Sequence, residues 1–187
     1  DGAEKEESQS QVMTTFFTSD THFGHQRTLE FSRRPFADVA SMDAALIANW
    51  NSTVQPGDTV YHLGDFGAVE CLEYVHQLNG KIILLPGNYE TPEMIQILAR
   101  SCEIIQPNTV IEVEGQRLQL VHEPDEALGG EFYLFGHVHQ LQMIKRNGLN
   151  VGTDCHFFRP IPLEVVLFYQ NAIYHHYDDN VFMEKLG

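Results

Sequence analysis

Residues 14–19 read TTFFTS, and the polar sequence DTHFGH follows at once as residues 20–25. The first segment is rich in β-branched and aromatic residues, which predicts a buried β-strand. The second segment places a carboxylate and two imidazoles directly after the predicted end of that strand. The same succession of apolar strand and polar cluster recurs along the chain, and it decides the fold.

Two more strands in the first half end in this way. Residues 59–63 (TVYHL) precede Gly-Asp-Phe, and residues 81–85 (KIILL) precede Pro-Gly-Asn-Tyr-Glu. Amphipathic helices are predicted between and after them, at residues 41–54 behind a Ser cap, at 69–78 before Asn-Gly, and at 91–100 behind Thr-Pro. This alternation of strands and helices is typical of a parallel α/β fold.

The second half has a different pattern. Residues 109–114 and 117–121 flank Gly-Gln and predict a hairpin, and residues 132–135 and 149–152 predict two further strands. Residues 163–169 fit either a helix or a strand, because their periodicity does not separate the two. We therefore expect an α/β fold in which a pair of mixed sheets carries helices on the outside.

Polar side chains gather at the predicted strand ends. Ligands of α/β folds bind at the carboxyl ends of strands, so we expect these side chains to meet at one edge. They are Asp20, His22, Asp65, Asn88, His122, His137 and His139. Glycines precede three of the clusters and would let the backbone turn sharply there.

Such a gathering of polar groups is costly unless a cation is present. Imidazole, carboxylate and amide oxygen suit Mn, Fe, Zn or Ni, and seven ligands suit two divalent ions better than one. Asp65 lies centrally in the order and is the natural bridge between the ions. Each motif alone is as readily a turn or a helix cap, so the prediction depends on all five occurring in order.

The ordered set resembles the calcineurin-like metallophosphoesterase superfamily, whose pattern is Asp-x-His, Gly-Asp, Gly-Asn-His-Asp/Glu, a lone His and Gly-His-x-His. The match covers residues 16–152. The segments FTSDTHFGH, RRPF and NVGTD are also similar to those of a compact bacterial or phage branch of predicted phosphoesterases. The resemblance implies a four-layer αββα sandwich and a dinuclear site. One ion would take Asp20, His22, Asp65 and His139, and the other would take Asp65, Asn88, His122 and His137.

One residue departs from that pattern. Tyr89 stands where many relatives have a His that is interpreted as a general acid or phosphate contact. A phenol has a pKa of about 10 and is a poorer proton donor than imidazole near neutral pH. His25, three residues after His22, is the best substitute, and a supporting or surface role for it is equally compatible with the sequence.

Other polar residues near the motifs fit more than one role. His62 is expected to pack under the site. Arg27, Arg33 and Arg34 could meet substrate phosphate, with Arg34 the leading candidate, although salt bridges are the better interpretation for at least two of them. Asp154 and His156 could orient ligands or simply form a turn.

Composition limits the partners and the compartment. The 187 residues include 26 acidic and 11 basic side chains, a net charge of −15 that opposes binding to an extended nucleic acid duplex. Three cysteines without a CxxC motif, no signal-peptide pattern and no apolar stretch of membrane length predict a cytoplasmic protein without a membrane partner. The sequence indicates no particular oligomeric state.

The ends of the chain also differ in composition. Residues 1–12 (DGAEKEESQSQV) are polar and acidic, and we expect a disordered tail that is either an expression remnant or a piece left by processing. Residues 13–187 are expected to form a single domain, with Met13 as the native start.

These observations predict a phosphoric ester hydrolase. Two divalent ions would hold a bridging hydroxide that attacks phosphorus in line, without a covalent enzyme intermediate. A small phosphodiester, such as a cyclic nucleotide or nucleotide derivative, is the leading substrate, and a phosphomonoester is the second. The alternative is a protein-interaction scaffold on the same fold, which a complete ligand set argues against.

Overall fold

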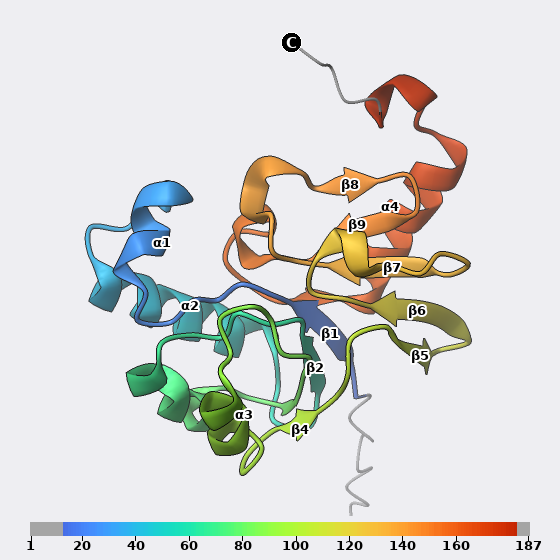
Figure 1. Ribbon diagram of the computed structural model, residues 1–187. Helices are drawn as coiled ribbons and strands as arrows, with labels where there is room; N and C mark the ends of the chain where they lie inside the picture. Colours follow the sequence, from blue (N-terminus) through green and yellow to red (C-terminus); the bar gives the residue numbers. More distant parts are fainter. Residues whose placement is uncertain (1–12, 183–187) are drawn as a thin grey trace, which may run out of the picture.

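The computed structural model describes residues 13–182, so the predicted tail at residues 1–12 lies outside the described part. Figure 1 shows the arrangement of its elements. The strands are β1 (Thr15–Thr18), β2 (Thr59–His62), β3 (Lys81–Leu84), β4 (Glu103–Ile104), β5 (Thr109–Val113), β6 (Gln116–Leu120), β7 (Phe132–Phe135), β8 (Ile144–Lys145), β9 (Gly148–Asn150) and β10 (Ile161–Pro162). The α-helices are α1 (Gln26–Phe31), α2 (Val39–Thr53), α3 (Pro92–Leu98) and α4 (Leu163–His175). The 3₁₀ helices are η1 (Val69–Gln77), η2 (Pro124–Glu126), η3 (His139–Leu141), η4 (Thr153–Cys155) and η5 (Asp179–Val181).

Two mixed five-stranded sheets form the centre of the fold, as the sequence predicts. The first sheet has the order β10-β1-β2-β3-β4, with β1 to β4 parallel and β10 antiparallel to β1. The second has the order β5-β6-β7-β9-β8, in which β6, β7 and β9 are parallel. The predicted hairpin is the antiparallel pair of β5 and β6.

Alternation along the strands divides the core into two parts. Phe16 on β1 packs with residues of α2, η1 and α3, such as Met42, Leu72 and Leu98. Its neighbour Phe17 belongs to the second cluster, which lies between the sheets and includes Leu120 and residues of α4. Successive residues of a strand point to opposite faces, so β1 contributes to both layers.

The helices follow the sequence with three differences. Helix α2 begins at Val39, and its N-cap is Asp38. Ser41, the expected cap, is instead the third residue of the helix and forms a capping box with Asp38. The helix predicted at residues 69–78 is the 3₁₀ helix η1, in which Leu72 and Val75 are buried at a spacing of three residues that the C-cap Leu78 continues. Helix α1 is not predicted by the sequence.

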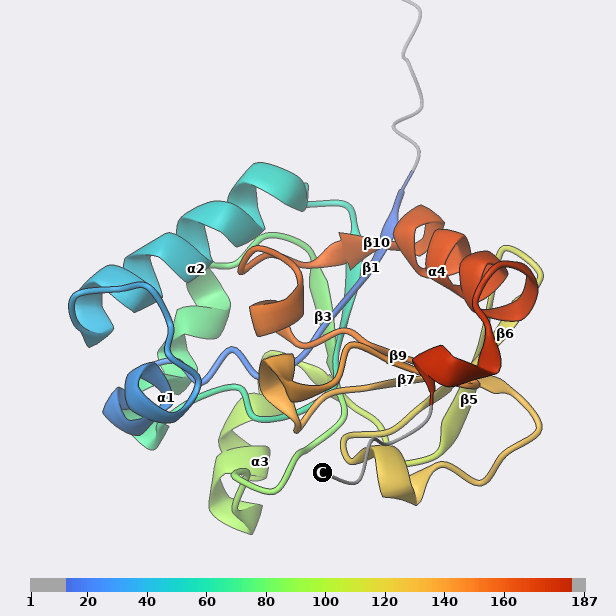
Figure 2. The same ribbon diagram turned by 90° about the horizontal axis from the view of Figure 1, so that it is seen from above.

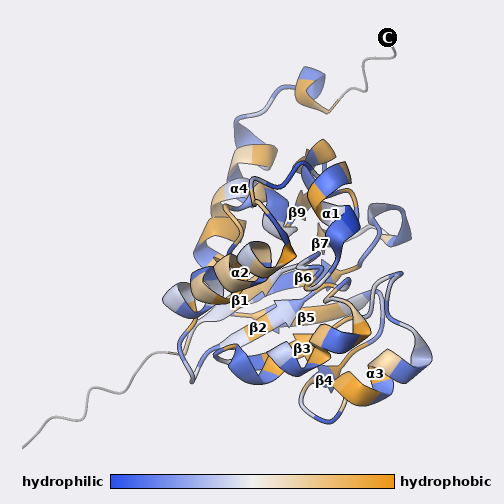
Figure 3. Cartoon of the chain, turned by 90° about the vertical axis from the view of Figure 1, so that its left-hand side faces the viewer, coloured by the Kyte–Doolittle hydropathy of each residue, from blue (hydrophilic) through white to orange (hydrophobic). Residues whose placement is uncertain are grey.

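The ambiguous segment after residue 163 is helical. Helix α4 packs against β1, β10 and β9, and Figure 3 shows it as mostly hydrophobic, in contrast to α1. None of the helices described between residues 13 and 182 combines the length and apolar character that a membrane crossing needs.

Candidate metal centre

Strand register brings the polar loops together. Thr18 of β1 pairs with His62 of β2, which pairs with Leu84 of β3, so these three strands end level with one another. Beyond the strands, the backbone N–H groups of Asp20 and His22 donate to the carbonyls of Gly64 and Asp65 at 3.0 Å. The loops after β1 and β2 therefore run side by side.

One group of candidate ligands lies on the first loop and near η3. Asp20, His22 and His139 are buried, and one ligand atom from each lies within 4.8 Å of the others. Both oxygens of Asp20 accept from the backbone N–H of His137, which joins this loop to the second sheet. The Nε2 atom of His22 is buried without a hydrogen-bond partner and lies 3.9 Å from Asp20 Oδ1.

A second group lies beside it. Asp65, His122 and His137 also place ligand atoms within 4.8 Å of one another. Asn88 Oδ1 lies 3.0 Å from both His122 Nε2 and His137 Nδ1. His122 Nδ1 is 2.6 Å from the carbonyl of Leu63 and must donate to it. A neutral His122 therefore carries its lone pair on Nε2, the nitrogen on the side of Asn88 and Asp65.

Asp65, a member of the second group, also faces the first. Its Oδ2 is 3.5 Å from Nε2 of His22 in the first group and 3.4 Å from Nε2 of His122 in the second. Its Oδ1 accepts from the backbone N–H of Tyr89 at 3.0 Å, which fixes the carboxylate. One oxygen is therefore directed at both groups, the arrangement that a bridging carboxylate requires.

The buried carboxylates and imidazoles of the site shift one another's pKa values. Burial raises the pKa of Asp20 and lowers the pKa of His22 well below its usual range. Burial would also lower the pKa of His122, but the hydrogen bond to Asp65 and the charges of both aspartates raise it to about 9. Burial would raise the pKa of Asp65, but His122 and His22 outweigh this and lower it. The two carboxylates thus favour positive charge at this point of the site, a preference that also suits a bound cation.

Asp154 orients one of the candidate ligands. Its Oδ2 accepts from Nδ1 of His139 at 2.9 Å, which leaves Nε2 of His139 free for a metal. The same carboxylate pairs with Arg34 through two bonds of 2.9 and 2.8 Å. His139 and Arg34 overcome the effect of burial and lower the pKa of Asp154 to about 2. Asp154 thus lies against the candidate ligand His139 and also within the 3₁₀ helix η4, so both roles left open by the sequence fit its position.

The expectation that Arg34 contacts substrate is wrong. Its side chain is 0% exposed and also donates to the backbone carbonyls of Thr21 and Asp20 at 2.8 and 2.6 Å. The guanidinium therefore holds the first loop from beneath. A buried arginine cannot be distinguished from an exposed one by its position in the sequence, and Arg27 and Arg33 beside it are exposed.

Two further buried residues hold the loops in place. His62 Nε2 lies 2.9 Å from Thr21 Oγ1 and packs beneath the site, as expected, and burial lowers its pKa to about 3. Glu90 accepts from the backbone N–H groups of Asp65, Phe66 and Gly87 at 2.9, 2.7 and 2.7 Å. The sequence motif included Glu90, but nothing in it indicated that its carboxylate joins the loops after β2 and β3.

The two candidate general acids lie at the rim. Tyr89 is 38% exposed, and the centroid of its ring lies 5.0 Å from that of His22 and 5.1 Å from that of His25. His25 Nδ1 is 3.0 Å from Nδ1 of His22, and burial lowers the pKa of His25. If His22 uses Nε2 for a metal, its Nδ1–H donates to His25, which then keeps its own proton on Nε2.

Left-handed backbone is concentrated in the site. The non-glycine residues with positive φ include Asp20, His22, Asp65, His137 and His139, at +49° to +69°. This conformation costs about 1–2 kcal/mol per residue, and such strain gathers at functional sites. Gly64 has φ +97°, as the predicted sharp turn requires.

Gly87, the glycine before Asn88, is required for a different reason. A Cβ at Gly87 would lie 2.8 Å from Cε1 of His122, so that position needs close approach and not an unusual φ.

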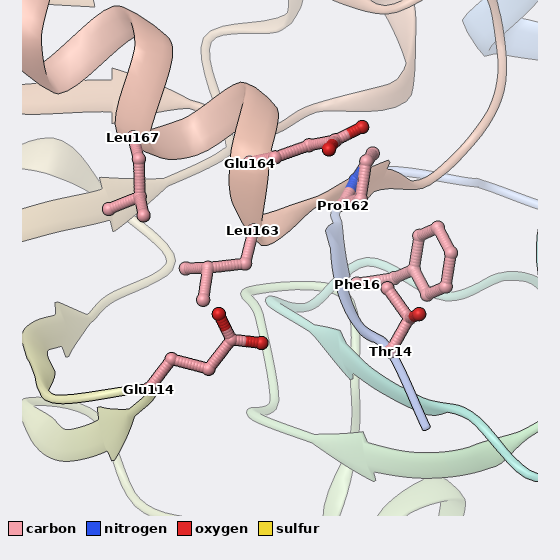
Figure 4. Close-up of a pocket in the computed structure, with 7 residues that line it drawn as sticks. All are labelled: Thr14, Phe16, Glu114, Pro162, Leu163, Glu164 and Leu167. Atoms are coloured by element: carbon pink, nitrogen blue, oxygen red, sulfur yellow. The ribbon is translucent and has the colours of Figure 1, made fainter. Parts of the chain in front are cut away.

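The residues present fit divalent metal ions. Nitrogen and carboxylate donors converge in two groups, a buried imidazole nitrogen has no partner, and one carboxylate oxygen faces both groups. A different cavity of about 430 Å³ lies near the start of β1, with Glu114 and Glu164 in its lining (Figure 4). Its carboxylates would repel a phosphate, which leaves the candidate metal centre as the better place for one.

Comparisons with known proteins agree with this geometry. A family model described as the calcineurin-like phosphoesterase superfamily domain matches residues 13–160. The uncharacterized protein MJ1445 of Methanocaldococcus jannaschii is 29% identical over 167 residues, which cover 81% of this chain and 88% of that protein. The Gene 66 protein of Mycobacterium phage L5 is 38% identical over 87 residues, 43% of this chain and 42% of the phage protein.

A solved structure shows the same fold. Protein AQ665 of Aquifex aeolicus, described as a protein of unknown function, matches with a TM-score of 0.69 and 23% sequence identity. The match covers 84% of this chain and 100% of that one.

Proposed function

The chain belongs to the calcineurin-like phosphoesterase superfamily, and we propose that it is a phosphodiesterase whose site holds two divalent metal ions. The observation that carries the proposal is the position of Asp65 Oδ2, 3.5 Å from an imidazole of one ligand group and 3.4 Å from an imidazole of the other. Asp20, His22, Asp65 and His139 would hold one ion. Asp65, Asn88, His122 and His137 would hold the other.

The ions, when bound, lower the pKa of a water molecule and neutralise charge on the phosphoryl oxygens. The chain's own residues fix the ligands. Leu63 and Asp154 accept the Nδ1 protons of His122 and His139, so both rings direct Nε2 inward. Tyr89 and His25 lie beside the candidate ligand His22, and we propose that they face the leaving group. Their hydroxyl and imidazole N–H can donate a hydrogen bond to its oxygen.

The charge balance favours a diester over a monoester. A diester carries one negative charge, whereas a monoester carries about two near neutral pH. Arg34, which lies against the site loops, is already paired with Asp154 and cannot neutralise a second charge. The chain is strongly acidic, which adds to the repulsion of a dianion. The metal identity is set by supply as well as by these ligands, since they accept several ions.

A direct assay tests the proposal. The wild type is loaded with Mn²⁺ and given methyl 4-nitrophenyl phosphate, a diester, or 4-nitrophenyl phosphate, a monoester. We expect faster turnover of the diester and a loss of at least 100-fold in Asp65→Asn, about 2.7 kcal/mol of transition-state stabilisation. The matched control is Asp179→Asn, whose side chain is 86% exposed. Full activity in Asp65→Asn, or none in a metal-loaded wild type, would reject the proposal.

The alternative, a protein-interaction scaffold, fits the ligand set less well. A scaffold has no need of a strained and fully furnished ligand set, whereas five of the seven candidate ligands adopt left-handed backbone. This observation favours the enzyme.

A further inference from the structure

A small cavity adjoins the candidate metal centre. It has a volume of about 200 Å³ and lies between the end of α1, at Phe31 and Ser32, and the loop of residues 137–141. His137 and His139, candidate ligands of different ions, form part of its lining. Figure 2 shows the orange segment after β7, which contains η3, extending toward α1. A phosphate held at the metal centre would therefore have one substituent at the mouth of this cavity.

Apart from the two histidines, the cavity lining is mainly apolar, with Phe31, Val138 and Leu141 beside the polar Ser32 and Gln140. Phe31 is 47% exposed although it is aromatic, and Leu141 is 88% exposed. The Phe31 ring meets that of His139 edge to face, with centroids 4.9 Å apart, and that of His22 at 6.4 Å. The imidazoles thus fix the position of the phenyl ring while leaving almost half of its residue surface uncovered. An exposed aromatic ring fixed beside a charged site is well suited to stack on another ring.

Size and charge restrict the occupant. Pockets for drug-sized ligands measure about 300–1,000 Å³, so this cavity suits one ring system and not a whole dinucleotide. Phe31, Val138 and Leu141 carry no charge, and Gln140 at the exposed edge offers an amide that can bond to polar ring atoms. An uncharged, planar ring with polar edges satisfies these conditions.

From this geometry we infer that Phe31 and Leu141 form a subsite for a planar, base-like ring on one side of the scissile phosphodiester. The inference builds on the proposed function and names its substrate class, a diester with a nucleoside on one side. Phe31 would stack on the ring, Leu141 would cover its edge, and the phosphate would stay at the metal centre.

The test compares two ligands that share a phosphate but differ in the ring. Thymidine 5′-monophosphate and methyl phosphate are titrated by calorimetry into the full chain loaded with Mn²⁺. Stacking of a base on an aromatic side chain is worth about 5- to 150-fold in affinity. We expect the wild type to prefer the thymidine ligand by this factor, Phe31→Ala to lose the preference, and Leu141→Ala to reduce it by about 3- to 10-fold. Affinity for methyl phosphate, which has no ring to stack, should change much less than affinity for the thymidine ligand in both variants.

Two controls keep the test decisive. Phe168→Ala removes a phenylalanine of α4 that is 66% exposed, and it should keep the full preference. Leu141→Ala removes an almost fully exposed side chain, so it remains informative if Phe31→Ala unfolds. No preference in the wild type, or a preference that survives both Phe31→Ala and Leu141→Ala, would overturn the subsite. A preference that depends on Phe31 in a protein that cleaves no diester would support the subsite and reject the proposed function instead.

Discussion

Asp154 shows how much of the site depends on a single residue outside the ligand set. It holds His139 by one bond and neutralises the fully buried Arg34 by two. Asp154→Asn should weaken Mn²⁺ binding by about 10- to 100-fold, because partners that orient ligands have effects of this size. It should also lower the metal-free free energy of unfolding by about 3–5 kcal/mol, because the Arg34 charge loses its partner. Chelator competition and urea unfolding measure the two effects. Unchanged metal affinity would show that His139 needs no orientation.

Tyr89 and His25 can be separated by the leaving group. If Tyr89 only hydrogen-bonds phosphate, the rate for a series of diesters should fall steeply as the leaving-group pKa rises, and Tyr89→His should flatten the slope. The measurement is log rate against leaving-group pKa. A shallow slope in the wild type with activity lost in His25→Ala would assign the proton donor to His25. A shallow slope that neither variant alters would contradict a role for both.

His62 predicts a pH dependence of stability. Its pKa is about 3 in the folded chain and about 6.5 when unfolded. The unfolded state therefore takes up a proton first as the pH falls, and stability is lost below about pH 6.5. Between pH 7 and pH 5 the wild type should lose about 2 kcal/mol more than His62→Gln, which cannot titrate. Urea unfolding at both pH values checks this, and equal losses would show that His62 is not buried in its neutral form.

At the residue scale the sequence predicted which side chains meet but not how the backbone presents them. The order of Asp20, Asp65 and Asn88 after successive strands was enough to predict one polar edge. The left-handed conformation of Asp20 and Asp65 has only a weak sequence signal, because glycine adopts positive φ readily whereas aspartate and asparagine do so only occasionally. Arg34 was misjudged because its burial depends on Asp154, 120 residues away.

Glu90 acts at the scale of elements, because it joins the loops that follow β2 and β3. Its carboxylate accepts three backbone N–H bonds, and in Glu90→Gln an NH₂ group would replace one acceptor oxygen. We expect a loss of about 1–3 kcal/mol in the free energy of unfolding and weaker metal binding, because Asp65 lies on one of these loops. Urea unfolding and chelator competition measure these effects, with exposed Glu73→Gln as the matched control. Stability equal to that of the control would contradict the anchoring role.

The elements themselves were predicted with uneven success, for reasons of length. The apolar runs of β1, β3 and β7 are buried on both faces and stand out in the sequence, as does the β-branched and aromatic run of β2. Strands β4, β8 and β10 have two residues each, too few for any periodicity. Helix α1 has six residues and no side-chain cap, so neither usual signal of a helix is present.

Metal should stabilise the whole molecule, because the candidate ligands come from both sheets. A ligand present at 100 times its Kd and bound only by the folded state adds about 2.7 kcal/mol, or roughly 5–10 °C in melting temperature for a chain of this size. Removal of Mn²⁺ with a chelator should lower the melting temperature of the wild type by this amount and that of Asp65→Asn by much less. Equal melting curves before and after verified metal removal would contradict the account.

Anomalous diffraction from crystals grown with Mn²⁺ would show directly whether two ions share Asp65. We expect two anomalous peaks per chain, one beside Asp20, His22 and His139 and the other beside Asn88, His122 and His137. Asp65 should lie between the peaks, with a carboxylate oxygen within coordination distance of both. A single peak, or two peaks that Asp65 does not join, would contradict it.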